Sequence, residues 1–386
     1  MTHFDAAIVG GGPAGCSAAI TLAQCGARVV LFEAKTYPHH KVCGEFLSPE
    51  CAALLDLLGL TSTLRSLAPV MIETACITAP GGTAWETRLP GVAWGLSRRA
   101  LDAALAQRAS MLGVDVRQAT TVTAIHGNLH TGFGIEARAS SRQEQFFART
   151  VIAAHGKRSA LDRALNRRFF DQPQPFVALK AHFRGPHLPG RIELHTFPGG
   201  YCGMSEIEDG SVNVCLLARE AAFRNARRSG HTNVDAFIQW MQSQNPRLRR
   251  WFSQASPGHW LSIAQIPFSH KPQIEGDILM AGDAAGLIAP LAGDGIAMAL
   301  RGGQLAASHM ARFLAGEYNS HELKRHYLAD WKREFAARLR LGRALQAVML
   351  RPYLLSPGLR LLTVFPPIAD YLVRHTRDLQ SLRSPS

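Results

Sequence analysis

The sequence predicts an α/β protein built from two interleaved lobes and a helical carboxy-terminal segment. A short apolar run at residues 6–9 ends in a cluster of glycines and is followed by a helix pattern. A second unit of this kind occupies residues 278–310. Between the two units, alternating apolar runs at residues 70–97 and 177–219 predict the strands of a mostly antiparallel sheet. The chain is therefore expected to leave its first lobe and to return to it.

The first glycine cluster has the spacing of a nucleotide-binding turn. Gly10, Gly12 and Gly15 form a G-x-G-x-x-G pattern. The first glycine allows the tight turn, the second lets the backbone approach a pyrophosphate, and the third lets the helix pack closely on the strand. The helix predicted from Pro13 to about Cys25 directs its free amide groups and positive dipole end at those phosphates.

An acid completes this unit. The apolar run from Arg28 to Phe32 predicts a second strand, and Glu33 follows it, 18 residues after Gly15. That spacing is close to the one expected for a carboxylate that binds an adenosine ribose. The order of strand, glycines, helix, strand and acid predicts a ligand that contains ADP, and a purely structural turn is the alternative.

Composition sets limits on the protein class. With 386 residues, 47% hydrophobic and 18% charged, the chain can bury a large core. It has no apolar run of about 20 residues, and its amino terminus is already the first predicted strand, so we expect a cytoplasmic protein. The seven cysteines include no C-x-x-C pair, which predicts reduced thiols and no metal site.

The net charge of +13 is concentrated near the end of the chain. Residues 324–386 contain 12 Lys and Arg against 4 Asp and Glu. This bias suggests contact with a membrane surface or an acidic carrier protein, and a solvated helix face explains it equally well. No nucleic-acid-binding motif is recognisable, so we expect no nucleic-acid partner.

A loop at residues 36–48 follows the second strand and can lie over whatever extends beyond the ADP. Cys43 is a candidate reactive thiol, but a small buried residue is the better interpretation. His39, His40 and Glu45 lack a fourth ligand, so a solvated loop is preferred to a metal site. A helix is predicted over residues 49–58 with Ser48 as its cap.

The second sheet is predicted from short runs and turn signals. Pro80 to Gly82 and Pro90-Gly91 predict turns, and Glu208 to Gly210 predicts a hairpin. Arg98 is expected to cap a helix, and Asp115 to Ile125 to form a strand pair. The sheet can be a platform for an apolar substrate, and a plain structural sheet explains the same pattern.

The downstream unit suits the remainder of a nucleotide cofactor. Ile278 to Ala281 predict a buried strand that ends at Gly282-Asp283, and Gly293 to Gly295 open a long helix. A carboxylate at a strand end suits a ligand with hydroxyl groups. The positive end of the helix stabilises negative charge on an electron-rich ring.

Together these motifs resemble a group of flavoproteins that includes p-hydroxybenzoate hydroxylase and the geranylgeranyl reductases. The resemblance rests on GGGPAG at residues 10–15, on Arg98 followed by Leu101-Asp102, and on GDAAG with P-x-x-G-D-G-I at residues 282–296. It covers residues 4–310 and implies FAD as the cofactor, in a Rossmann-like lobe of the p-hydroxybenzoate hydroxylase type. Because there is no second glycine fingerprint, the protein is expected to use NAD(P)H as a transient electron donor or to receive electrons from a partner.

The resemblance also implies which residues hold FAD. Glycine-turn residues and Glu33 bind the ADP half, Arg98 the pyrophosphate region, Val122 the adenine and Asp283 the ribityl chain, and the downstream glycine segment passes under the flavin ring. The full predicted set is Gly10, Gly12, Pro13, Ala14, Gly15, Glu33, Ala34, Lys35, Cys43, Gly44, Arg98, Val122, Gly282, Asp283, Pro290, Gly293, Asp294, Gly295 and Ile296. One departure is His155-Gly156, where the family usually has Asp-Gly.

The predicted domains follow from these assignments. Residues 1–69, 98–160 and 271–310 form the FAD-binding lobe, residues 70–97 and 161–270 the substrate lobe, and residues 311–386 a basic helical segment.

Two reactions are compatible with the resemblance. In the favoured one, a flavin hydroperoxide hydroxylates an apolar aromatic or polyketide-like substrate. In the other, reduced FAD saturates double bonds of a prenyl or other lipid chain, as KVCGEFLSPE at residues 41–50 suggests by its similarity to the reductases. The W-x-W-x-I-P signature of tryptophan halogenases is missing. A flavin-binding protein without turnover is the third interpretation.

No catalytic base can be named from the sequence. His195 and His270 lie near predicted sheet ends, but a lone histidine on an apolar strand is more often a satisfied core residue. Near the end of the chain, the apolar stretch at residues 354–373 is interrupted by prolines. It can line a substrate tunnel, rest on a membrane surface or simply pack on the first lobe.

Overall fold

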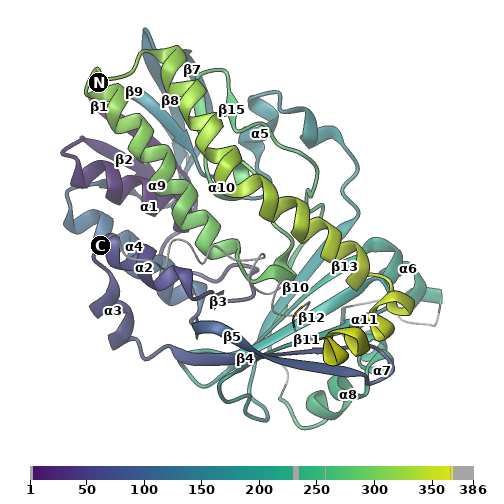
Figure 1. Cartoon of the computed structure of the whole chain (residues 1–386). Helices are drawn as coiled ribbons and strands as arrows, with labels where there is room; N and C mark the ends of the chain where they lie inside the picture. Colours follow the sequence, from purple (N-terminus) through teal and green to yellow (C-terminus); the bar gives the residue numbers. More distant parts are fainter. Residues whose placement is uncertain (1–2, 229–233, 257, 366, 368–386) are drawn as a thin grey trace.

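The structure, a computed structural model, describes residues 3–228, 234–256, 258–365 and 367. Two sheets lie end to end in Figure 1, and two long antiparallel helices, α9 (Gly295–Leu314) and α10 (Ser320–Met349), cross the first of them. This is the mixed α/β fold with two sheets and a helical carboxy-terminal part that the sequence predicts.

The first sheet has the parallel order expected around a nucleotide-binding turn. Its path is β15-β16-β9-β1-β2-β6, and a hairpin of β7 and β8 attaches through β9. All contacts of β1 and β2, and that of β16 with β9, are parallel, so these strands end at one edge of the sheet. The strands are β1 (His3–Val9), β2 (Val29–Phe32), β6 (Asp115–Arg117), β7 (Thr120–Asn128), β8 (Gly132–Ala139), β9 (Arg142–Ala153), β15 (Ile274–Glu275) and β16 (Ile278–Met280).

Helix α1 (Pro13–Gln24) packs between this sheet and α9 at very short range. A Cβ atom on Gly303 of α9 would lie 2.1 Å from the Ala14 carbonyl oxygen, so only glycine fits. Ser17 Oγ donates to the Leu300 carbonyl at 2.8 Å. The downstream unit is thereby locked against the amino-terminal one. Helices α2 (Glu50–Leu57), α3 (Thr61–Ser66), α4 (Arg98–Met111) and α5 (Ala160–Ala164) complete this part of the chain.

The second sheet has the order β14-β10-β13-β12-β11-β4-β5-β3 and is antiparallel apart from the β4–β11 pair. One face packs on helices α6 (Glu220–Arg228), α7 (Val234–Gln244) and α8 (Pro246–Phe252). The opposite face, called here the inner face, contacts Glu45 through Lys180 and His182 and packs farther along on Leu287 and Met349. The strands are β3 (Phe46–Leu47), β4 (Val70–Thr78), β5 (Ala84–Gly95), β10 (Phe176–Phe183), β11 (Arg191–Phe197), β12 (Gly200–Glu206), β13 (Val212–Arg219) and β14 (Leu261–Ile263).

Several local predictions were wrong. Pro90-Gly91 is no turn but lies within β5, where the pairing with β4 skips from Arg88 to Ala93 because proline has no amide hydrogen to donate. The segment predicted as a strand pair at residues 115–125 forms β6 and the start of β7, which pair with β2 and β8 and not with each other.

The predicted helix caps also differ. Ser97 rather than Arg98 caps α4, since its side chain accepts a hydrogen bond from the Ala100 amide at 3.1 Å. Pro49 rather than Ser48 precedes α2. The predicted hairpin at Glu208 to Gly210 does connect β12 and β13. The domain boundaries remain a prediction.

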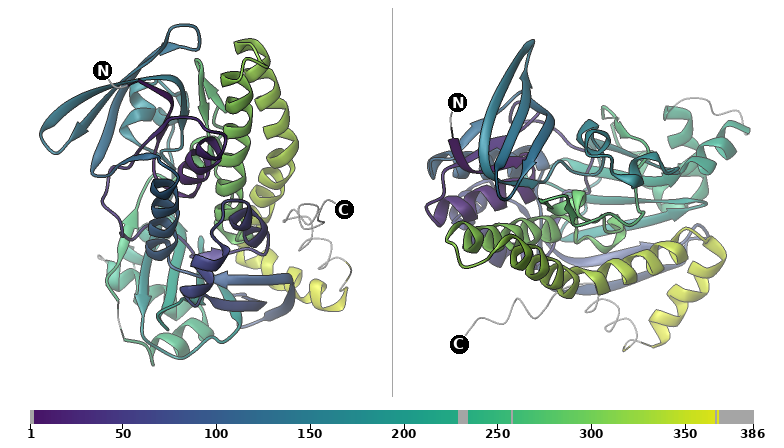
Figure 2. Two further views of the ribbon diagram at one scale, coloured as in Figure 1. Left: turned by 90° about the vertical axis from the view of Figure 1, so that its left-hand side faces the viewer. Right: turned by 90° about the horizontal axis from the view of Figure 1, so that it is seen from above.

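Helix α11 (Pro352–Val364) follows α10 and turns away from it at the outer end of the second sheet (Figure 2). Its inward side chains pack near β5, and others point to solvent. No described helix is long and apolar enough to cross a membrane. The last part of the apolar stretch predicted to line a tunnel or meet a membrane, residues 366 and 368–373, lies outside the described residues.

Candidate active site

The glycine turn after β1 lies at the edge where the parallel strands end. Gly10 has φ +104°, and a Cβ atom there would lie 2.4 Å from the carbonyl oxygen of Ala154, which directly follows β9. A Cβ on Gly15 would lie 1.8 Å from the Gly10 carbonyl oxygen. Gly12 differs, because its Cβ would meet nothing nearer than an Arg98 nitrogen at 3.5 Å. Gly10 and Gly15 thus serve the fold, and Gly12 keeps space open for a ligand.

The start of α1 is open toward that space. Gly12 is its N-cap, and no described side chain caps the helix or places an acid in its first turn, which begins with Pro13 and Ala14. Free amides and the positive end of the helix therefore face the crevice, an arrangement that suits a phosphate.

Glu33 lies beside the glycine turn, as its spacing predicts. Its side chain is 4% exposed; Oε2 accepts the Gly11 amide at 2.9 Å, and Oε1 accepts the Lys35 amide at 3.1 Å. Ala34 and Lys35 are exposed. The Glu33 carbonyl accepts the Thr120 amide at the start of β7, so Val122 lies two residues from this contact. Contact of Val122 with adenine remains a prediction.

Arg98 brings a permanent positive charge to the same place. Its guanidinium donates to both carboxylate oxygens of Asp102, at 2.7 and 2.8 Å. Burial alone would lower the pKa of Arg98, but the Asp102 carboxylate raises it above its ordinary value. A fixed cation near Gly12 supports the predicted role at a pyrophosphate.

The downstream unit reaches the crevice through two more glycines. Gly282 has φ +60°, and a Cβ atom on it would lie 2.7 Å from Ala14 Cβ, so the two glycine turns are in close contact. The half-buried Asp283 follows it directly. Lys271 Nζ holds this turn by donating to the Asp283 and Lys157 carbonyls at 2.7 and 2.6 Å. Burial lowers the pKa of Lys271 to about 8.

The segment predicted to pass under a flavin ring begins with a short turn at Pro290–Ala292. Gly293 has φ +70°, and a Cβ there would lie 2.9 Å from the Phe46 ring. Asp294 precedes α9 and lies 3.6 Å from a nitrogen of Arg338. Gly295 begins α9, and Ile296 is buried in its first turn. The segment therefore touches the loop at residues 36–48, which runs into the second sheet.

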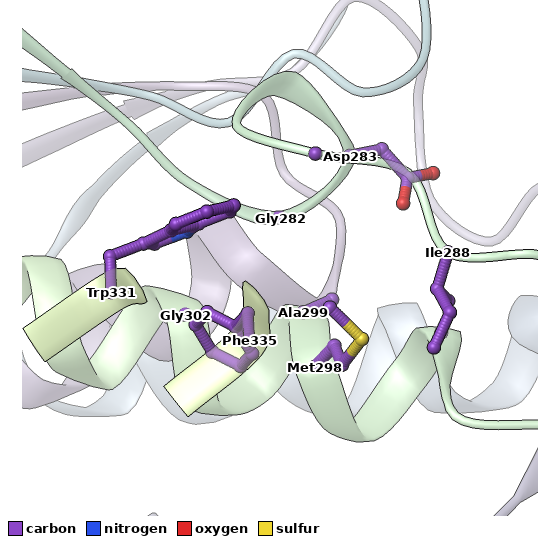
Figure 3. A pocket seen from close by; sticks show the side chains of 10 residues that line it. Gly282, Asp283, Ile288, Met298, Ala299, Gly302, Trp331 and Phe335 are labelled. Carbon is purple, nitrogen blue, oxygen red and sulfur yellow. The ribbon is translucent and has the colours of Figure 1, made fainter. Parts of the chain in front are cut away.

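The predicted crevice fits FAD. Helices α1 and α9 both begin at the crevice, and Arg98 supplies a cation at its phosphate end. Carboxylates follow two of the parallel strands, Glu33 after β2 and Asp283 after β16. Between α9 and α10, Figure 3 shows a pocket lined by Asp283, Met298, Trp331 and Phe335, among others. Its volume of about 10 Å³ is no more than one water needs, so this pocket is not a ring site.

A buried ionic cluster, not predicted from the sequence, joins the loop to the second sheet. Glu45 accepts Lys180 Nζ at 2.6 Å, His182 Nε2 at 2.6 Å and the Arg98 amide at 2.8 Å. Glu45 is fully buried and Lys180 is 1% exposed. Burial alone would raise the pKa of Glu45, but the bond from His182 and the charge of Lys180 hold it below its ordinary value. Glu45 is therefore a carboxylate, not a member of the solvated loop that was predicted.

The cluster continues as a polar row across the inner face. His182 pairs with Asn213 and Asn213 with Ser205 on successive strands, so the three side chains share one face. Asn213 Nδ2 donates to the Cys43 carbonyl at 3.2 Å. Asn213 Oδ1 and Ser205 Oγ are buried and have no hydrogen-bond partner in the described part of the chain. Buried polar atoms in this state call for a partner that a ligand or water can supply.

Cys43 and Gly44 lie in the stretch of loop that this row holds. Cys43 is half-buried, and its sulfur accepts the Glu45 amide at 3.5 Å. Gly44 is exposed, and nothing lies within 4 Å of where its Cβ would be. The Arg98 guanidinium lies beside the Cys43 sulfur, and no base bonds this thiol within the described residues. Contact of Cys43 and Gly44 with FAD remains a prediction.

Along β10 from His182 toward Phe176, the inner face changes from polar to apolar side chains. Lys180 is followed on the same face of β10 by Ala178, next to Leu217 of β13 and Tyr201 of β12. Leu287, just before the ring segment, packs into the same group. This inner apolar cluster consists of Ala79, Trp85, Ala178, Tyr201, Leu217, Ile266, Leu287, Met349, Leu350, Leu355 and Leu359.

Two histidines noted in the sequence have no catalytic setting. His195 is 1% exposed and bonds Thr78 at 2.8 Å and Glu193 at 2.9 Å, as a satisfied core residue does. His270 is exposed. At the family's usual acid position, His155 instead bonds the Asp162 carboxylate at 2.9 Å. A carboxylate is thus present beside this turn, supplied from α5.

The profile of the family described as FAD binding domain matches residues 3–336, most of the chain. The protein belongs to this FAD-binding family. It is therefore an FAD-dependent oxidoreductase, and FAD is its cofactor.

Relatives of this FAD-dependent oxidoreductase carry several activities. A menaquinone reductase of Mycolicibacterium smegmatis is 29% identical over 366 residues, which cover 89% of this chain and 87% of that protein. Among solved structures, a flavin-dependent brominase superposes with a TM-score of 0.80 at 20% identity, covering 97% of this chain and 93% of the other. A geranylgeranyl bacteriochlorophyll reductase-like protein of Thermoplasma acidophilum gives 0.76 at 20% identity, covering 99% and 95%. At these identities the two structures establish the fold alone.

Proposed function

We propose that this protein is an FAD-dependent monooxygenase that hydroxylates an apolar aromatic or polyketide-like substrate with electrons from NAD(P)H. One observation carries the proposal. The inner face of the second sheet passes from the polar row at His182, Asn213 and Ser205 to the inner apolar cluster, beside the segment at residues 290–296. A substrate with an oxygen-bearing ring and a hydrocarbon part fits both halves.

Bound FAD supplies the redox chemistry, and the protein supplies position, dryness and charge. Hydroxylation of a phenol is favoured when its ring is electron-rich, which loss of the phenolic proton achieves. His182 is placed to accept that proton: its Nε2 donates to Glu45, which leaves Nδ1 as the acceptor. The tautomer follows from this bond, because the ionised Glu45 can only accept.

Lys180 stabilises the resulting negative charge. It lies two residues from His182 on the same face of β10, and its single hydrogen bond within the described residues is to Glu45. Glu45 thus holds both basic side chains in place. In surroundings with little water, their charge acts more strongly on the substrate than it would in solution.

The relatives favour a second candidate, reduction of a double bond in a lipid chain. The menaquinone reductase matches nearly the whole chain, and KVCGEFLSPE resembles the reductases. Such a reaction uses the inner apolar cluster in the same way. It does not by itself require a base beside an ionised carboxylate, which is why the geometry ranks it second.

The test is anaerobic reduction of the FAD-loaded protein by NADPH or NADH, followed by rapid mixing with labelled dioxygen and pentadecylphenol. The proposal predicts a transient flavin spectrum that is neither oxidised nor reduced, and a product that carries one labelled oxygen atom. Direct reoxidation without labelled product, together with saturation of a prenylated quinone under anaerobic conditions, would instead assign the reductase.

A further inference from the structure

Helix α11 is apolar on two sides. Leu355 and Leu359 are buried in the inner apolar cluster, which Leu362 also contacts. A second set of apolar side chains is exposed, and at 3.6 residues per turn its members fall on one outward stripe. The stripe consists of Tyr353, Leu354, Pro357, Leu361, Val364 and Phe365.

This outward stripe is unusually exposed. Tyr353 is 72%, Val364 69%, Phe365 51% and Leu361 47% accessible. Single exposed apolar residues are ordinary on soluble proteins, but a contiguous apolar face marks a site of contact. Within the described residues nothing covers it.

Positive charge borders the stripe at Arg351 and Arg360, whereas the side chain of Arg338 on α10 is only 11% exposed and lies beside Asp294. The 31 residues from Phe335 to Phe365 contain no Asp or Glu and five arginines: Arg338, Arg340, Arg343, Arg351 and Arg360. Arg351, the N-cap of α11, and Arg360 within the helix are exposed, and neither forms an ion pair within the described part of the chain. An apolar helix face bordered by arginines has the chemistry of helices that lie in the interface of an anionic membrane.

The position of α11 favours a flat partner. Figure 2 shows α11 at the outer end of the second sheet, turned away from α10, and the exposed fractions of the stripe leave it open to a large surface. We propose that this outward stripe docks on the surface of an anionic lipid bilayer, with Tyr353, Leu361, Val364 and Phe365 inserted among the lipids and Arg351 and Arg360 at the headgroups.

Docking would also place the inner apolar cluster next to the lipid phase. The buried side of α11 contributes Leu355 and Leu359 to that cluster, so one helix separates the bilayer from the proposed substrate site. The contact does not depend on which reaction the protein catalyses. Any apolar substrate that resides in the membrane would benefit from it.

The test measures binding of the FAD-loaded protein to vesicles of phosphatidylcholine alone and of phosphatidylcholine with phosphatidylglycerol. We expect binding to the anionic vesicles that weakens in high salt. The variant Leu361→Asp/Val364→Asp should lower it at least about tenfold. The matched control Leu57→Asp/Met111→Asp changes two apolar residues on α2 and α4 that are at least as exposed, and this variant should bind like the unchanged protein.

Three results would overturn the proposal. The first is equal vesicle binding by the Leu361→Asp/Val364→Asp variant and the unchanged protein. The second is an unchanged protein that forms dimers but does not bind vesicles, together with a variant that is monomeric, and the third is vesicle binding that appears only after the chain is shortened at Phe365. The second assigns the stripe to another copy, and the third to the chain's own end. Flavin reduction by NADPH, measured in parallel, reports on the proposed function independently of all three.

Discussion

The FAD crevice and the inner face of the second sheet differ in how far apart along the chain their parts lie. In the crevice, Gly11 bonds Glu33 across 22 residues within one βαβ unit. On the inner face, Glu45 bonds Lys180 across 135 residues, and Cys43 meets Asn213 across 170. The glycine turn and Glu33 therefore follow from spacing within one unit, whereas the ionic cluster forms only after the loop at residues 36–48 has met the second sheet.

The largest effect should come from filling the crevice. Gly12→Val adds a side chain where the protein leaves room, so the chain should fold but lose all its flavin on desalting, because the pyrophosphate approach is blocked. Flavin content and melting of the apoprotein measure this. As a control, Gly10→Val should fail to fold stably, since its Cβ meets the Ala154 carbonyl at 2.4 Å. A Gly12→Val protein that stays fully yellow would contradict the assignment of the pyrophosphate to the space at Gly12.

Breaking the ionic cluster should destabilise the joint between the lobes. Glu45→Leu leaves Lys180 buried without its carboxylate and should lower the free energy of unfolding by about 3–5 kcal/mol. Adding Lys180→Met should restore most of the loss. Urea unfolding of the single and double variants measures the coupling, and additive losses would mean that the two residues do not act as a pair.

Substitution of the proposed base His182 should slow the reaction without affecting the binding of FAD. His182→Gln should reduce kcat/KM for hydroxylation of pentadecylphenol about 10²-fold while flavin content is unchanged. His187→Gln is the matched control, because His187 also bonds a glutamate, at 2.8 Å, but is 79% exposed. Equal rates for the two variants would remove His182 from the mechanism.

A smaller effect concerns the turn that carries Asp283. The pKa of Lys271 falls from 10.5 to about 8 on folding, so between these values the unfolded chain holds a proton that the folded chain has lost. Stability should then rise with pH through this window, by at most about 1.4 kcal/mol per pH unit. In Lys271→Met this rise should be absent. If the free energy of unfolding changes equally with pH in the unchanged protein and in Lys271→Met, the lowered pKa of Lys271 is contradicted.

The same contrast explains what the sequence could predict. The glycine turn and Glu33 follow a spacing set by local geometry, the resemblance to the flavoproteins adds Arg98 and Asp283, and the structure brings all of them to one crevice. Lys180, His182 and Ser205 follow no such spacing. A single polar residue in a strand of a binding site cannot be told from one in a sheet that binds nothing. Glu45 was recognised only as part of a polar loop, since its side-chain partners Lys180 and His182 lie on β10, which begins more than a hundred residues later.

The central claim is that the polar row selects a hydroxyl group beside the inner apolar cluster. The measurement is titration of the FAD-loaded protein with pentadecylphenol and with its methyl ether, followed by the flavin spectrum. Asn213 Oδ1 and, in the proposed tautomer, His182 Nδ1 can only accept, and only the phenol has a proton to donate to one of them. The phenol should therefore bind about tenfold more tightly than the ether, and Ser205→Ala and Asn213→Leu should reduce that preference, with Ser262→Ala as control. Equal affinity for phenol and ether in the unchanged protein would contradict the account.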